Sequence, residues 1–212
     1  MKKMNQTLWL LLALSLTFVT GCSEDDDPEP IPVEYGGITF PQGEISFADA
    51  VVSYTPGPGV SSPYDDPTLA LEAPDDTEYT DNAVALGDEG VLVLRFTDNS
   101  LITSGDSEYD LWIFEIGDLE PTDVAISTDG TGWIEVGANS GATSGIDIDA
   151  YIGSGVVAGK KYYFVKLTDL LPHQTGSPYA GADIDAVGAI TTVPEGIITA
   201  GGSDGVTTPA IK

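Results

Sequence analysis

The stretch 110-DLWIFEIGDLEPTDVAISTDGTGWIEVG-137 carries the densest strand signals in the chain. Its first run, Leu111–Phe114, is short, β-branched and aromatic, and an acid and a glycine close it soon afterwards, which is typical of a strand buried on both faces. Two β-rich runs follow, Val124–Ser127 and Trp133–Val136, with Asp129-Gly130 between them. Because glycine tolerates the positive φ that a tight turn requires, this second half predicts a β-hairpin.

Strand-and-turn composition continues on both sides of this stretch. No long segment shows a 3.6-residue apolar period, and 25 Gly and 14 Pro separate the short runs. This pattern predicts an all-β fold, an antiparallel β-sandwich, over residues 37–198, with a flexible tail at 199–212. Four further runs have strand composition, and a fifth segment is either a short helix or the edge of a strand: Ile45–Tyr54, Gly90–Phe96, Tyr162–Leu167 and Ile184–Ile190, with Ile146–Tyr151 as the ambiguous one.

The N-terminus has the pattern of a lipoprotein leader. Lys2 and Lys3 precede an apolar run, Leu8–Val19, that ends in small residues before Cys22. The run is short for a transmembrane helix, so residues 1–21 predict a signal peptide and Cys22 the acylated first residue of the mature chain. The alternative is an ordinary secretory cleavage site with an incidental cysteine. Since Cys22 is the only cysteine in the sequence, no intramolecular disulfide can form.

Residues 22–36 predict an extended tether. Its SEDDDPEPIP segment, 23–32, is acidic and then proline-rich, so it cannot bury a core. After an acylated cysteine, such a run resembles the acidic export signal of lipoproteins that face outward in some Gram-negative bacteria. The resemblance implies an outer-membrane lipoprotein exposed at the cell surface, with the lipid anchor as its only membrane contact. A solvated linker without address information is the alternative.

The charge of the chain limits its partners. The formal net charge is −27, and removal of Lys2 and Lys3 with the leader makes it −29. Such a chain repels nucleic acid and anionic lipid headgroups, so neither is expected as a direct partner, whereas divalent cations are attracted. For most individual carboxylates, solubility is sufficient explanation.

A family resemblance extends over most of the mature chain, from about Phe47 to Ile190. The predicted hairpin, with SFADAVVSY at 46–54, ALEAPD at 70–75 and GADIDAVGA at 181–189, is similar to a poorly characterised group of bacterial cell-surface domains. These belong to the discoidin-like, galactose-binding-like jelly-roll type. The resemblance implies a jelly-roll sandwich with calcium held between loops near the chain ends. The group has no well-defined activity to carry over.

Two acidic patterns are candidate Ca²⁺ sites. In one, three acids alternate ahead of the predicted buried strand, so on an extended backbone they would point the same way and repel one another without a cation. In the other, the tetrapeptide Asp-Ile-Asp-Ala occurs twice, and its alternation would turn Ile to the core and both carboxylates outward. An exposed acidic loop is the alternative in each case, and the resemblance favours the second copy of the repeat. The candidate ligands are Asp106, Glu108 and Asp110, then Asp147 and Asp149, then Asp183 and Asp185.

A glycan ligand requires an exposed aromatic platform beside polar groups. Trp112 and Trp133 lie in strand patterns and are expected in the core. The loop aromatics are better candidates, and the alternative for each is that it packs a loop onto the sandwich: Tyr64, Tyr79, Tyr109 and Tyr179.

Catalysis finds little support in the sequence. His173 is the only histidine, in a loop-like PHQTG segment, and there is neither an HExxH motif nor a glycine-rich phosphate loop. No acid pair stands out for a carboxylate-based glycoside hydrolase. We therefore expect a non-enzymatic, lipid-anchored binding or adhesion module with structural calcium and a glycan ligand. The alternative is a structural protein-assembly subunit of the cell envelope without a small ligand.

Overall fold

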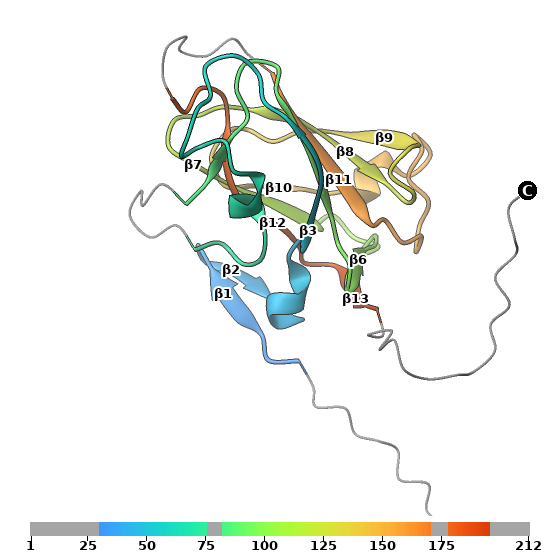
Figure 1. Cartoon of the computed structure of the whole chain (residues 1–212). Helices are drawn as coiled ribbons and strands as arrows, with labels where there is room; N and C mark the ends of the chain where they lie inside the picture. The colour runs from blue at the N-terminus through green and yellow to red at the C-terminus, as the bar shows by residue number, and fades with distance from the viewer. Residues whose placement is uncertain (1–29, 76–81, 171–177, 196–212) are drawn as a thin grey trace, which may run out of the picture.

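Two antiparallel sheets lie face to face in the computed structural model, which describes residues 30–75, 82–170 and 178–195 (Figure 1). The predicted all-β sandwich is confirmed. The larger sheet has the strand order β3-β5-β11-β8-β9, with bounds Ala50–Thr55, Val91–Arg95, Phe164–Asp169, Thr122–Ser127 and Trp133–Ala138. The smaller sheet has the order β10-β7-β12-β4, with bounds Ser144–Ile146, Leu111–Ile116, Asp183–Ala189 and Val84–Ala85.

Short elements complete the described chain. Two further ladders lie outside the main sheets: β1 (Val33–Tyr35) with β2 (Ile38–Phe40), and β6 (Asn99–Leu101) with β13 (Thr192–Pro194). The helical elements are single 3-10 turns: η1 (Gly43–Ser46), η2 (Pro67–Ala70) and η3 (Asp149–Tyr151). None of the helices in the described part of the chain is long and apolar enough to cross a membrane.

The main core lies between the two sheets. Alternate residues of each strand point inward, because successive side chains of a strand face opposite sides. Burial of each large aliphatic side chain contributes about 1.5–3 kcal/mol of stabilisation. From the larger sheet the core receives Leu92, Leu94, Val124, Ile126, Val165 and Leu167, and from the smaller sheet Leu111, Ile113, Ile184 and Val187.

A third layer covers the outer face of β7 and β12. The β1–β2 hairpin and the segment after η1 place Phe40 and Phe47 against Phe114 and Ala186, in a second buried cluster. Gly188 of β12 lies directly beneath them, where an added Cβ would be 2.7 Å from both Phe40 and Phe47. In Figure 1 this hairpin, in blue, packs below the sandwich. The sandwich therefore includes residues 33–36, which the sequence had placed in the tether.

Residues 110–137 fold as their sequence predicts. β7 pairs on both sides, with β10 and β12, and is the buried strand expected at 111–114. β8 and β9 form the predicted hairpin around Asp129-Gly130, with Ser127 opposite Trp133. The expected strand at 45–54 is only half right, because the 3-10 turn η1 occupies its start and β3 begins at Ala50. The segment 146–151 divides between β10 and η3.

Several sequence predictions fall outside the described residues. They include the signal peptide, Cys22, the acidic run of the tether, and the tail at 199–212. Tyr79 and His173 also lie there.

Candidate functional site

Asp110 is the buried centre of an acidic cluster at the start of β7. Its side chain is 0 % exposed. The backbone N–H of Ser104 donates to Asp110 Oδ1 and that of Ile148 to Asp110 Oδ2, each at 3.0 Å. A carboxylate buried among aligned N–H donors is held in one orientation.

Asp147 and Asp149 reach the same place because β10 pairs with β7. Ile146 lies opposite Leu111, and the chain then continues past Asp110 into η3. Ile148 is buried and both aspartates are half-buried, as the alternation of the Asp-Ile-Asp-Ala repeat predicts. One carboxylate oxygen from each of Asp110, Asp147 and Asp149 lies within 4.8 Å of the others, so this triad could hold a metal ion.

The loop before β7 supports the triad from the other side. Ser104 Oγ and Gly105 N–H both donate to Asp149 Oδ2, each at 3.1 Å. Both bonds end on Oδ2, and they hold the Asp149 carboxylate in one orientation. Local sequence does not identify Ser104 as part of the site, because its role depends on the loop folding back onto η3.

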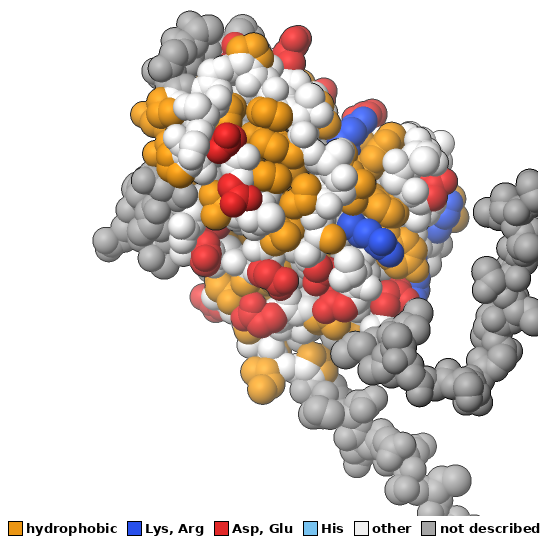
Figure 2. All heavy atoms as spheres, in the orientation of Figure 1, with side chains coloured by type: hydrophobic (Ala, Val, Ile, Leu, Met, Phe, Trp, Pro, Cys, Tyr) orange, Lys and Arg blue, Asp and Glu red, His pale blue; other side chains and the backbone are white. Residues whose placement is uncertain are grey.

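The triad has no cationic partner in the described ranges. The ion pairs found there are Lys161–Glu195 and Lys166–Glu135. Figure 2 shows Lys and Arg side chains only on the right of that view, while Asp and Glu side chains are spread over the whole visible face. Burial raises the pKa of Asp110, while hydrogen bonds from Thr191, Ser104 and Ile148 oppose that shift. The negative charge of Asp149 also raises the pKa of Asp110. A bound cation would relieve this repulsion between the carboxylates.

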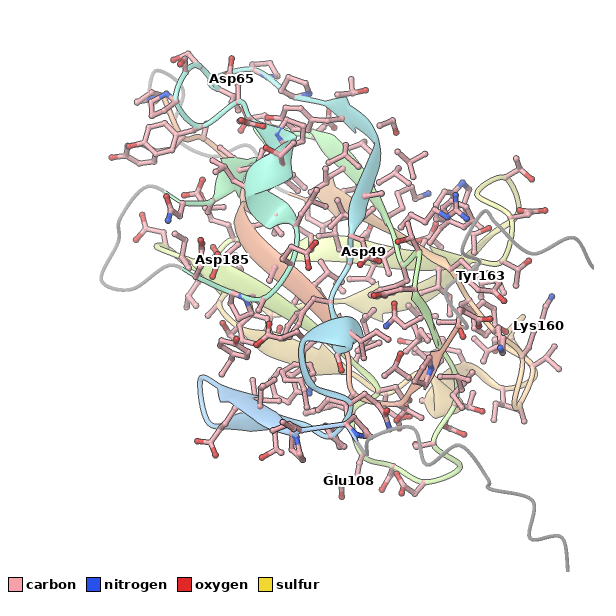
Figure 3. The ribbon with its side chains drawn as sticks, turned by 60° about the horizontal axis from the view of Figure 1, so that its bottom comes forward. Asp49, Asp65, Glu108, Lys160, Tyr163 and Asp185 are labelled. Atoms are coloured by element: carbon pink, nitrogen blue, oxygen red, sulfur yellow. The ribbon has the colours of Figure 1, made fainter. Side chains whose placement is uncertain are left out.

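The other two predicted acids of this region do not join the triad. The segment 105–110 is a series of bends rather than an extended strand, so the expectation that its acids point one way is wrong. Asp106 and Glu108 are exposed whereas Asp110 is buried. Asp106 lies nearby, with its Oδ1 also 3.1 Å from Ser104 Oγ, whose single proton goes to one of Asp106 and Asp149 at a time. Glu108 projects from the lower edge in Figure 3.

The second copy of the repeat lies elsewhere. A β-bulge at Asp185 interrupts the pairing of β12 with β7 and reverses the alternation, so Asp185 is buried instead of outward-facing. Asp185 Oδ1 accepts the N–H of Asp75 at 3.3 Å. Figure 3 shows Asp185 well separated from Glu108. Asp183 and Asp185 therefore do not converge with Asp147 and Asp149 on one ion.

A hollow of about 310 Å³ is lined by Tyr109, Trp112 and residues of the segment 138–145. Tyr109, the residue before Asp110, is 50 % exposed and meets the Trp112 ring edge to face at 5.4 Å between centroids. Its ring rests on the backbone of Gly145, where any Cβ would overlap it. Around the two rings lie Ala138, Ser140, Thr143, Ser144 and Gly145. An aromatic pair with hydroxyl groups beside it is the kind of surface that sugars bind.

The tryptophans are less buried than expected. Both are only half-buried. Trp112 packs against the second buried cluster while lining the hollow. Trp133 faces outward on β9, with Lys166 Nζ 5.1 Å from its ring centroid.

Two more of the predicted tyrosines meet at a different place. Tyr64 and Tyr179 pack edge to face at 5.2 Å, and Tyr179 is 50 % exposed. Tyr179 also forms a β-bridge with Val60. This pair ties loops together, as the alternative interpretation of the loop aromatics expects.

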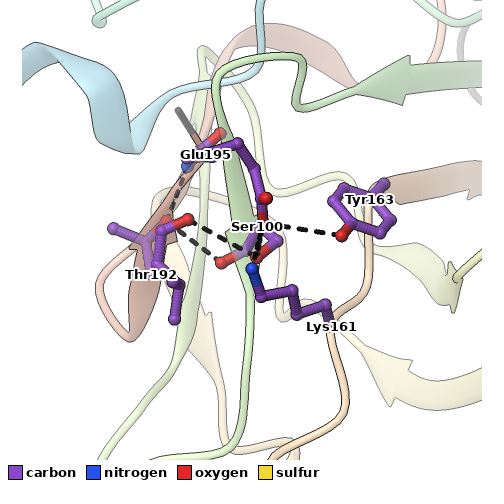
Figure 4. Close-up of polar contacts among 7 residues, drawn as sticks. Ser100, Lys161, Tyr163, Thr192 and Glu195 are labelled. Atoms are coloured by element: carbon purple, nitrogen blue, oxygen red, sulfur yellow. Dashed lines mark hydrogen bonds and ion pairs between the residues drawn. The ribbon is translucent and has the colours of Figure 1, made fainter. Parts of the chain in front are cut away.

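A separate polar cluster, not foreseen from sequence, has a structural explanation (Figure 4). Glu195 Oε1 lies 2.6 Å from Lys161 Nζ and accepts the hydroxyl groups of Ser100 at 3.0 Å and Tyr163 at 3.5 Å. These contacts lower the pKa of Glu195 and raise that of Lys161. Because all three donors serve one carboxylate, the cluster secures the end of β13.

Comparisons with protein-family models, with curated proteins and with solved structures found no match to this chain.

Proposed function

We propose that the protein is a lipid-anchored, cell-surface binding module in which calcium on the aspartate triad supports a glycan-binding hollow. The observation that carries the proposal is the adjacency of the two features. Tyr109 forms the aromatic surface, and the next residue, Asp110, is the buried member of the triad. A cation that orders the triad therefore also orders the residue on which the sugar would stack.

Calcium suits the triad better than a transition metal. Its members offer only hard oxygen ligands, which Ca²⁺ and Mg²⁺ prefer, and the described part of the site contains neither His nor Cys. Asp110 comes from one segment and the pair Asp147 and Asp149 from another, so Ca²⁺, with its flexible coordination, fits such a set more readily than strictly octahedral Mg²⁺. The family resemblance, which implies calcium between loops, agrees with this choice.

A glycan suits the hollow better than an apolar ligand. The aromatic faces of Tyr109 and Trp112 are accompanied by the hydroxyls of Ser140, Thr143 and Ser144. Sugars present apolar C–H faces together with hydroxyl groups, so they use both kinds of surface. The volume of about 310 Å³ is at the small end for ligand sites and fits one or two sugar units.

The proposed lipid anchor would locate the binding module at the membrane surface. An acylated Cys22 followed by an acidic, proline-rich tether would hold the sandwich outside the membrane surface, where glycans of the surroundings are accessible. Globomycin-sensitive processing and protease accessibility on intact cells would test this part independently of the ligand.

The ligand proposal is tested by isothermal titration of the purified sandwich against a panel of neutral and acidic oligosaccharides, with calcium present. Wild-type protein should bind at least one, and Tyr109→Ala should weaken that binding at least tenfold. Tyr179→Ala is the matched control, since Tyr179 is equally exposed but does not line the hollow, and it should bind normally. No binding to any glycan, together with a stoichiometric protein co-purifying from membranes, would instead favour the assembly subunit.

A further inference from the structure

Glu115 is a buried acid that the proposed site does not use. It lies near the end of β7 and faces the interior, in alternation with Leu111 and Ile113, and it is 3 % exposed. Its Oε2 accepts the backbone N–H of Ala142. Its Oε1 is buried without a hydrogen-bond partner in the described part of the chain.

The loop that Glu115 holds is strained. Ala142 has φ 62°, a left-handed conformation that is costly for a residue with a Cβ. The neighbouring Gly141 packs backbone to backbone on the loop after β7, where an added Cβ would be 2.7 Å from the carbonyl carbon of Leu119. A strained conformation persists only where contacts enforce it, and the bond to Glu115 is such a contact.

Two further buried side chains complete the arrangement. Asn139 Oδ1 accepts the N–H of Thr122 at 2.8 Å and that of Gly141 at 3.3 Å. Asn139 and Glu115 thus accept consecutive N–H groups, those of Gly141 and Ala142. Thr122 Oγ1 and Asn139 Nδ2 are also buried and lack hydrogen-bond partners among the described residues.

This same loop is the wall of the hollow. Ala138, Ser140, Thr143, Ser144 and Gly145, which line it with Tyr109 and Trp112, all belong to residues 138–145. The loop thus contacts Glu115 on its inner side and presents hydroxyl groups on its outer side.

We infer that Glu115 is a positioning residue that fixes residues 138–145 as the wall of the hollow, together with one buried water shared with Thr122 and Asn139. The water would accept from Asn139 Nδ2 and from a protonated Glu115 Oε1, and donate to Thr122 Oγ1. Such a site has the polar partners that a buried water requires. Only the identity of what the hollow binds rests on the proposed function.

The protonation state of the Glu115 side chain determines whether residues 138–145 stay fixed. Burial raises its pKa to about 8; the bond from Ala142 opposes the shift, while Glu120, Asp183 and Asp118 reinforce it. Asp169 of β11 also points inward here, opposite Thr122. At neutral pH the side chain is therefore protonated and can donate to the water. Ionisation at alkaline pH would place a buried charge beside these carboxylates and loosen the loop.

Hydrogen exchange at the Ala142 amide tests the inference, with protection corrected for the intrinsic exchange rate at each pH. Wild-type protection should fall at least tenfold between pH 6.5 and pH 9. Glu115→Gln, which keeps an acceptor for Ala142 and a donor for the water, should protect Ala142 equally at both pH values. Glu115→Leu should lower the protection of Ala142 at least tenfold at both pH values relative to that of Val165 in β11, which serves as the reference for global stability.

Two outcomes would overturn the inference. One is equal protection of Ala142 in wild-type protein and Glu115→Leu, and the other is the same pH dependence in Glu115→Gln as in wild-type protein. The second comparison suffices if Glu115→Leu fails to fold. No glycan is used, so a chain that binds no sugar would still show the expected exchange, and failure of the proposed function is distinguishable from failure here.

Discussion

The Ile148 N–H donates to Asp110 Oδ2 at 3.0 Å, across 38 residues of sequence. This bond joins the start of a central strand to the segment between β10 and η3. It places Asp110 between Asp147 and Asp149, which lie on either side of Ile148. The bond and the triad therefore depend on the same pairing of β10 with β7.

Gly188→Ala tests the third layer. The new methyl carbon would lie 2.7 Å from both Phe40 and Phe47, so the β1–β2 hairpin must shift. We expect a loss of about 1–3 kcal/mol in the free energy of unfolding, measured by chemical denaturation. Gly132→Ala is the control, because its methyl meets only Asp129 Oδ1, at 3.8 Å, and it should change stability little. Equal stability of the two variants would show that the hairpin does not pack as described.

Gly145→Ala tests the aromatic surface formed by Tyr109 and Trp112 without disrupting the fold. Its Cβ would overlap the Tyr109 ring, and since Tyr109 is half exposed the ring can swing into solvent at little cost to the core. Near-UV circular dichroism should change as the Tyr109–Trp112 contact is lost, while the melting temperature stays within a few degrees of wild type. Any glycan bound by wild-type protein should bind at least tenfold more weakly. An unchanged aromatic signal would contradict the seating of Tyr109 on Gly145.

Glu115→Gln should alter the pH dependence of stability. The pKa of Glu115 rises from an ordinary 4.5 to about 8 on folding, so the folded protein binds more protons than the unfolded chain between these values. Wild-type stability therefore carries a contribution that is present below pH 4.5 and is lost as pH rises to about 8. Glutamine does not titrate, so the stability of Glu115→Gln lacks this dependence on pH.

The measurement is denaturant unfolding of both proteins at pH 5 and pH 8. They should be similarly stable at pH 5, and the variant should be more stable at pH 8 by about 1–3 kcal/mol. Parallel curves across this range would mean that Glu115 is not held in its protonated form.

The sequence predicts individual strands better than it predicts which strands pair or pack together. The hairpin at 124–136 and the buried strand at 111–114 follow from local composition and turn chemistry, and both are confirmed. The β1–β2 hairpin was missed although Gly36-Gly37, between two short β-rich runs, is a recognised turn signal. The acidic composition just before it favoured a tether instead.

The candidate site was only partly predictable for a related reason. The two copies of Asp-Ile-Asp-Ala are identical in sequence, yet one precedes a 3-10 turn beside Asp110 and the other contains a β-bulge. The long-range pairing of strands determines this difference, and the local periodicity of the sequence does not indicate it. Glu115 did give a signal, since a lone acid inside an apolar strand must either ionise at a cost or stay neutral.

Calcium titration is the decisive test of whether the aspartate triad is a metal site. Isothermal titration should show one Ca²⁺ site in wild-type protein and at least tenfold weaker binding in Asp149→Asn, whose amide oxygen can still accept from Ser104 and Gly105. Glu108→Gln, which removes an equal charge from an exposed neighbour, should bind as wild type does. Calcium at 100 times its dissociation constant should also add about 2.7 kcal/mol to stability. No calcium binding by the wild-type protein, or equal weakening by both variants, would contradict the account.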